Sequence, residues 1–139
     1  MVRLALYKNV VWWDLGAWVI RKWTGSPYSH TELVIGDMFY SSSIQDGGVR
    51  AKVIEPDSDK WDFIDLPWAD QSKVLDYYDQ TMGQAYGWYD LPLQQLFNTH
   101  IDGRGRLCSG WCAAALGLDD GDSFWPGLLG MVCKWVNSL

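Results

Sequence analysis

The chain has 139 residues, with 17 Asp and Glu against 11 Lys and Arg, a net charge of −6 and 48% hydrophobic residues. This length fits one domain spanning residues 1–139, and the hydrophobic content is sufficient to build one core. The negative charge would repel phosphate backbones and anionic membrane surfaces, so nucleic acid is not an expected partner.

Targeting signals and cysteine usage indicate the compartment. No apolar run has the length of a membrane-spanning helix, and the first residues have the pattern of a strand, not of a signal peptide. The three cysteines are an odd number without the spacing of a disulfide framework, which favours a reducing environment. These features predict a cytoplasmic protein with no stable insertion into a membrane.

Strand-like segments fill the first half of the chain. Each is short, rich in apolar or β-branched residues and bounded by turn residues, with Gly36-Asp37 and Gln45-Asp46-Gly47-Gly48 as turns. The predicted strands are Val2–Lys8, Ser29–Gly36, Met38–Ile44, Val49–Ile54 and Trp61–Leu66.

Helical segments dominate the second half. The pattern predicts a flexible basic loop over residues 102–106, directly before Cys108. The predicted helices are Val10–Trp23, Asp70–Met82, one or two turns in Leu91–Phe97, Cys108–Leu116 and Leu128–Val136. Strands followed by helices give an α+β fold, with an antiparallel sheet from the first half packed against helices of the second half.

Cys108 and His30 carry the chemical signal. Cys108 opens a predicted helix of small residues, and His30 stands at the head of a predicted strand. A helix N-terminus lowers the pKa of a thiol, and an imidazole within reach can take its proton and pass it to a leaving group. The pair predicts a cysteine hydrolase, the alternatives being an inert buried cysteine and a structural histidine. Cys112 and Cys133 are expected to be packing residues.

A third residue would orient the imidazole. Glu32 follows His30 by two positions, so both side chains lie on one face of a strand, and a carboxylate would stabilise the imidazolium. Ser41, on the next predicted strand, is the alternative, but its hydroxyl carries no charge. We therefore expect Glu32 to fill this role ahead of Ser41.

The segment Gly83-Gln84-Ala85-Tyr86-Gly87-Trp88, followed by Cys108-Ser109-Gly110, resembles the signature of the NlpC/P60 cysteine peptidases. Because the His30 strand precedes these motifs, the chain resembles the circularly permuted papain-like branch, which includes YiiX/YaeF-like hydrolases and small phage-encoded members. The resemblance implies Cys108 as nucleophile, His30 as base and Tyr86 beside the thiolate. Ser109 and Gly110 are small enough for a substrate to approach the backbone, and the Cys108 amide, together with Tyr86, is expected to stabilise the oxyanion.

The resemblance implies cleavage of an amide or ester bond through an acyl-enzyme, with a peptidoglycan-type peptide as the expected substrate. A lipid or acyl amide hydrolase or acyltransferase is an alternative that the ten tryptophans favour. Another alternative is an inactive module on the same fold that binds or inhibits a host protein. Two histidines and scattered cysteines do not supply a set of metal ligands, so neither a metal nor another cofactor is expected.

Overall fold

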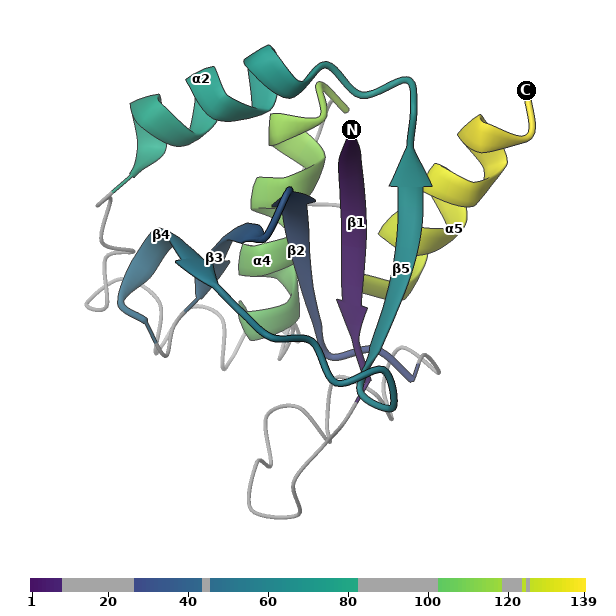
Figure 1. Ribbon diagram of the computed structural model, residues 1–139, viewed down its shortest axis with the longest axis horizontal. Coiled ribbons are helices and arrows are strands. Elements are labelled where there is room, and N and C mark those ends of the chain that lie inside the picture. The colour runs from purple at the N-terminus through teal and green to yellow at the C-terminus, as the bar shows by residue number, and fades with distance from the viewer. Residues whose placement is uncertain (9–26, 44–45, 83–102, 119–123, 125) are drawn as a thin grey trace.

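The computed structural model describes residues 1–8, 27–43, 46–82, 103–118, 124 and 126–139 (Figure 1). Its centre is a five-stranded antiparallel sheet in the order β4-β3-β2-β1-β5. The strands are β1 (Val2–Tyr7), β2 (His30–Ile35), β3 (Met38–Ser43), β4 (Gly48–Val53) and β5 (Trp61–Leu66). The five strands predicted from the sequence are confirmed, with ends that match or differ by one residue.

β1, the first strand of the chain, lies inside the sheet between β2 and the edge strand β5. β1 pairs with β2 on one side and with β5 on the other, so that Tyr7 lies opposite both His30 and Trp61. The two predicted turns contain glycines in the left-handed region, Gly36 at φ 64° and Gly47 at φ 84°. Glycine enters this region without steric cost, which explains the tight connections around β3.

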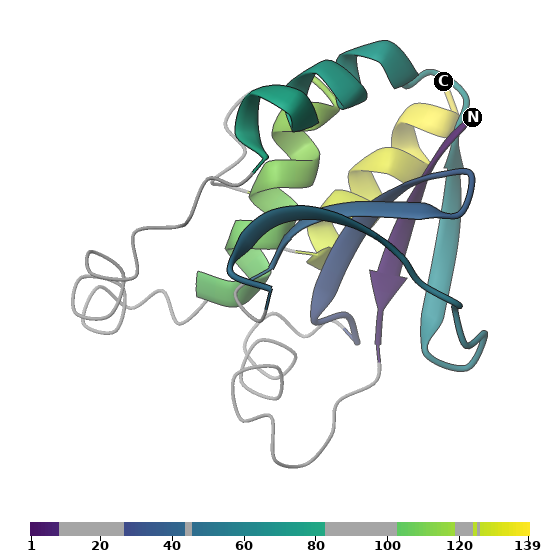
Figure 2. The same cartoon turned by 60° about the vertical axis from the view of Figure 1, so that its left-hand side comes forward.

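Three helices pack around the sheet in the part of the chain that the structure describes. They are α2 (Gln71–Thr81), α4 (Gly103–Ala115) and α5 (Pro126–Asn137). The helix α4 packs against β2 and β3, and α5 packs against β5 and β1, on the same side of the sheet (Figure 2). The α+β class, with a first-half sheet covered by second-half helices, is confirmed. None of the described helices is long and apolar enough to cross a membrane.

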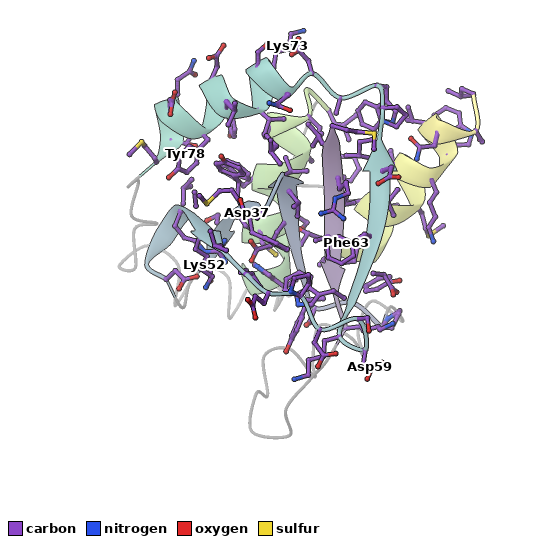
Figure 3. The ribbon with its side chains drawn as sticks, viewed as in Figure 1. Asp37, Lys52, Asp59, Phe63, Lys73 and Tyr78 are labelled. Atoms are coloured by element: carbon purple, nitrogen blue, oxygen red, sulfur yellow. The ribbon has the colours of Figure 1, made fainter. Side chains whose placement is uncertain are left out.

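The main core lies between the sheet and the helices. Alternate residues of β1 face it, and they meet Trp111 of α4 and Leu129 of α5. α5 approaches closely at Gly130, where a Cβ atom would lie 2.8 Å from Leu6 Cδ1. A second, smaller cluster contains Ala5, Val34 and Phe39, with Ile54, Trp61 and Phe63 packed against it; Phe63 is labelled in Figure 3.

The start of α4 corrects the sequence-based prediction. The predicted loop over 102–106 is wrong from Gly103 onward, because the helix begins there and Cys108 lies five positions further along. Glycine costs about 1 kcal/mol in a helix interior, which is why Gly103 and Gly105 indicated a loop. Burial of Trp111 and its neighbours against the sheet outweighs that cost. The predicted helices Val10–Trp23 and Leu91–Phe97 lie outside the described residues.

Candidate active site

The contact between α4 and β2 brings Cys108 and His30 together. The thiol of Cys108 and the imidazole of His30 are hydrogen-bonded. Cys108 is fully buried, whereas the side chain of His30 is 21% exposed. Two residues that are 78 positions apart in the chain therefore form the acid–base pair that a thiol nucleophile requires.

Glu32 contacts the other side of the same imidazole. Its Oε1 lies 2.9 Å from His30 Nε2, and its side chain is only 2% exposed. Arg50 donates to both oxygens of this carboxylate, from Nη1 to Oε2 at 2.7 Å and from Nη2 to Oε1 at 2.6 Å. An ionised carboxylate only accepts hydrogen bonds, so His30 Nε2 carries a proton and donates a hydrogen bond to Glu32 Oε1. The thiol of Cys108 is then left with Nδ1 as its partner.

The three groups adjust one another's pKa. Burial would lower the pKa of His30, but the charge and hydrogen bond of Cys108, together with Glu32, raise it to about 9. Burial would raise the pKa of the Cys108 thiol, yet the charge and hydrogen bond of His30 lower it below its usual value. Hydrogen bonds from Arg50 and His30 outweigh burial at Glu32 and hold its pKa down. The arrangement favours a thiolate beside an imidazolium.

The pKa of the Cys108 thiol is lowered by neighbouring residues and not, as expected, by the N-terminus of its helix. Only the first four residues of a helix have unpaired backbone N–H groups, and Cys108 lies beyond them in α4. The helix terminus therefore does not activate the thiol, and the Cys108 amide is not free to form an oxyanion hole. After His30, the backbone and hydroxyl of Thr31 are the groups that lower the Cys108 pKa.

The two serines singled out in the sequence have structural contacts. Ser41 Oγ donates to the backbone oxygen of Thr31 at 2.8 Å, which ties β3 to β2 beside His30. Ser109 is buried, and its Oγ donates to the backbone oxygen of Phe124 at 2.6 Å. Neither of these hydrogen bonds reaches the imidazole, so the geometry agrees with the order Glu32 before Ser41. Tyr86 lies outside the described residues.

The other two cysteines have a different environment. Cys112, one helical turn after Cys108, accepts a hydrogen bond from the Thr31 hydroxyl at 3.6 Å. Burial, followed by the charge of Cys108, raises the pKa of Cys112 well above its usual value. Burial also raises the pKa of Cys133 to about 12. In the described parts of the chain, no group of three His, Cys, Asp or Glu side chains could hold a metal ion.

Arg50 is the site residue that the sequence analysis missed. It lies on β4, two strands away from β2, and its Nε also donates to Asp46 Oδ2 at 2.7 Å. Lys52, labelled in Figure 3, donates to the same Asp46 oxygen at 3.0 Å. A buried carboxylate needs a cation beside it, so an orienting Glu32 should have a positively charged partner. Arg50, on a nearby predicted strand, was a candidate for that partner.

Comparisons with protein-family models, with curated proteins and with solved structures found no match to this chain.

Proposed function

We propose that the chain is a cysteine hydrolase with a circularly permuted papain-like fold. The observation that carries the proposal is the row Cys108–His30–Glu32, in which a buried thiol, an imidazole and an ionised carboxylate are joined by hydrogen bonds. The order along the chain also supports it, because the strand with His30 precedes the helix with Cys108. The resemblance of Cys108-Ser109-Gly110 to the NlpC/P60 signature points the same way.

The reaction begins with the Cys108 thiolate and the His30 imidazolium. Sγ attacks the carbonyl carbon of an amide or ester, and the tetrahedral intermediate collapses as the C–N or C–O bond breaks. His30 gives its Nδ1 proton to the departing amine or alcohol, which leaves a thioester on Cys108. His30 then takes a proton from water as the water oxygen attacks the thioester; the C–S bond breaks, the acid product leaves, and the Cys108 thiolate and His30 imidazolium are restored. Glu32 stabilises the imidazolium in both acylation and deacylation.

The proposed substrate class is a peptide amide of the peptidoglycan type, on the strength of the resemblance. Lipid or acyl amides form the second class, and the same acyl-enzyme would serve an acyltransferase if an alcohol or amine replaced water. Both substrate classes present a carbonyl to the same thiol. The identity of the bond that is cleaved therefore distinguishes them, not the nucleophile.

A binding or inhibitory module on the same fold is the second candidate. The observation that favours it is the complete burial of Cys108, which a substrate carbonyl has to reach. The lowered pKa of Cys108 favours the enzyme, because a thiol used only for packing gains nothing from an imidazole partner.

The test compares wild-type protein with Cys108→Ala and, as a matched control, Cys133→Ala. Cys133 is buried on α5 and packs in the main core. Muropeptides and fatty acyl amides are offered separately, with the released amine measured, and acyl-enzyme is trapped and located by mass spectrometry. We expect turnover and a thioester at Cys108 in wild type and in Cys133→Ala only. Wild-type turnover by Cys108→Ala, or an inert thiol in the wild type, contradicts the proposal.

A further inference from the structure

A carboxylate buried as deeply as Glu32 requires compensation for its charge. Its side chain is 2% exposed, and removing an ionised group from water is costly unless the group is paired and hydrogen-bonded. His30 supplies one hydrogen bond to Oε1, but an imidazole in a catalytic cycle loses and regains its charge. A permanent cation is therefore needed beside Glu32.

Arg50 supplies that cation in a fixed geometry. Its two terminal nitrogens reach the two oxygens of Glu32 at 2.7 and 2.6 Å, and its own side chain is 14% exposed. A guanidinium that binds a carboxylate with two parallel hydrogen bonds fixes the plane of that carboxylate. Oε1, held by Arg50, is also the atom that accepts from His30. The position of Arg50 thus determines where the acceptor for the imidazole lies.

The remaining nitrogen of the guanidinium, Nε, also makes a hydrogen bond. Arg50 Nε donates to Asp46 at 2.7 Å, and Asp46 lies in the turn directly before β4. Hydrogen bonds from Arg50 and then Lys52 outweigh burial and lower the pKa of Asp46 to about 2. Charges of alternating sign therefore run from the Cys108 thiolate through His30 and Glu32 to Arg50 and the turn.

We infer that Arg50 is a positioning residue of the active site, which acts through Glu32 to hold His30 in the orientation and charge state that keep Cys108 reactive. The inference rests on the proposed function and adds a fourth member to its machinery. Arg50 touches Glu32 and not the reacting atoms, so it is a positioning and not a catalytic residue.

Loss of Arg50 is expected to raise the pKa of the Cys108 thiol. Among the described residues, the titratable groups that interact with Glu32 are His30 on β2, Cys112 on α4 and Arg50 on β4. Cys108 interacts with His30 and Cys112, and Asp46 with Arg50. Without Arg50, Glu32 either stays ionised and adds uncompensated negative charge near the thiolate, or takes a proton and stops supporting the imidazolium. Both outcomes make the Cys108 thiolate harder to form, so its pKa rises.

The test measures the rate at which iodoacetamide alkylates Cys108 as a function of pH, using peptide mapping of the folded protein. Arg50→Met is expected to move the acid limb to higher pH, so that alkylation at about pH 6 is about tenfold slower, one pKa unit. Arg50→Lys keeps the positive charge but cannot make the two parallel hydrogen bonds to Glu32, so it should recover part of the alkylation rate. Lys52→Met, which removes only the second partner of Asp46, should match the wild type.

A double variant tests whether Arg50 acts through Glu32. If Arg50→Met fails to fold, Arg50→Lys takes its place in the comparison of the two backgrounds. Glu32→Gln with Arg50→Met removes both buried charges, and within the Glu32→Gln background the loss of Arg50 should change the alkylation profile far less than in the wild type. Equal effects in the two backgrounds overturn the inference, as does an Arg50→Met profile that matches the wild type. If Cys108 of the wild type reacts no faster than Cys112, the proposed function itself fails.

Discussion

The carboxylate of Glu32 lies 2.9 Å from His30 Nε2, on the same strand and two residues further along the chain. A strand places alternate side chains on one face, so this contact requires no help from a neighbouring strand. The orienting group and the base are thus fixed relative to each other by a single element. Their relation to the nucleophile depends only on how α4 packs on β2.

Replacing Glu32 with Gln tests the orienting role. The variant keeps the shape and a hydrogen bond to His30 but loses the charge that stabilises the imidazolium. We expect turnover to fall by about 10–100-fold, below the roughly 10⁴-fold loss for the Asp of a serine triad. The pKa of His30, raised to about 9 in the wild type, should also fall, which moves the alkaline limb of the kcat/KM profile to lower pH.

Ser41→Ala is the matched comparison for that variant. Its hydroxyl bonds to the backbone oxygen of Thr31, so we expect a stability loss of about 1 kcal/mol for one hydrogen bond and a smaller change in turnover. Activity that survives in Glu32→Gln but collapses in Ser41→Ala would reverse the two assignments.

The three thiols should react at very different rates. All three are buried, but the pKa is lowered only at Cys108 and is raised at Cys112 and Cys133. Iodoacetamide at neutral pH should therefore modify Cys108 first, and His30→Ala should slow that reaction because the imidazole is the main group that lowers the pKa. Mass spectrometry of tryptic peptides after timed quenching provides the rates. Uniform labelling, or labelling that ignores His30, contradicts an activated pair.

The strands and the His30–Glu32 contact could be predicted from the sequence because their signals are local. Turn glycines such as Gly36 mark the strand ends, and the spacing from His30 to Glu32 fixes their shared face. The turn and strand signals operate over a few residues and do not depend on tertiary packing. The pairing of His30 with Cys108 has no local signal, and it was expected only from the chemistry of the two residues and from a resemblance to a known motif.

The start of α4 and the role of Arg50 depend on tertiary structure. Gly103 and Gly105 have low helix propensity, and only the packing of the later turns of α4 on the sheet explains why the helix extends through them. Arg50 reaches Glu32 across β3, and it does so because Glu32 is buried, a property that the residues of β2 alone do not reveal. Both misses concern long-range geometry that local patterns do not encode.

Gly130→Ala tests how closely α5 approaches the sheet. A Cβ at this position would lie 2.8 Å from Leu6 Cδ1, and Leu6 is itself buried. Overpacking costs about 1–3 kcal/mol, whereas the helix propensity of Ala returns about 1 kcal/mol, so we expect a net loss of stability in urea unfolding. Adding Leu6→Val should recover part of the loss, because valine is shorter. A Gly130→Ala variant as stable as the wild type would show that the contact is looser.

The last prediction concerns stability in acid. The folded-state pKa of Glu32 lies below its ordinary 4.5, and that of Asp46 falls from 3.8 to about 2. A depressed carboxyl pKa contributes stability that is present above the unfolded value and is lost as the pH falls through the folded value. The urea midpoint should therefore decrease as the pH is lowered from 4.5 toward 2, the range that these two groups span.

Arg50 is the cation that both carboxylates share, so Arg50→Met should bring both pKa values closer to those of the unfolded chain. We expect this variant to be less stable than the wild type at neutral pH, because Glu32 loses its strongest partner. Its urea midpoint should nevertheless change less steeply with pH below about 4.5, since less stability remains to be lost on protonation. Lys52→Met, which affects Asp46 alone, should give an intermediate slope. Parallel wild-type and Arg50→Met curves would mean that other carboxylates govern acid unfolding and that Arg50 does not hold Glu32 in its ionised form.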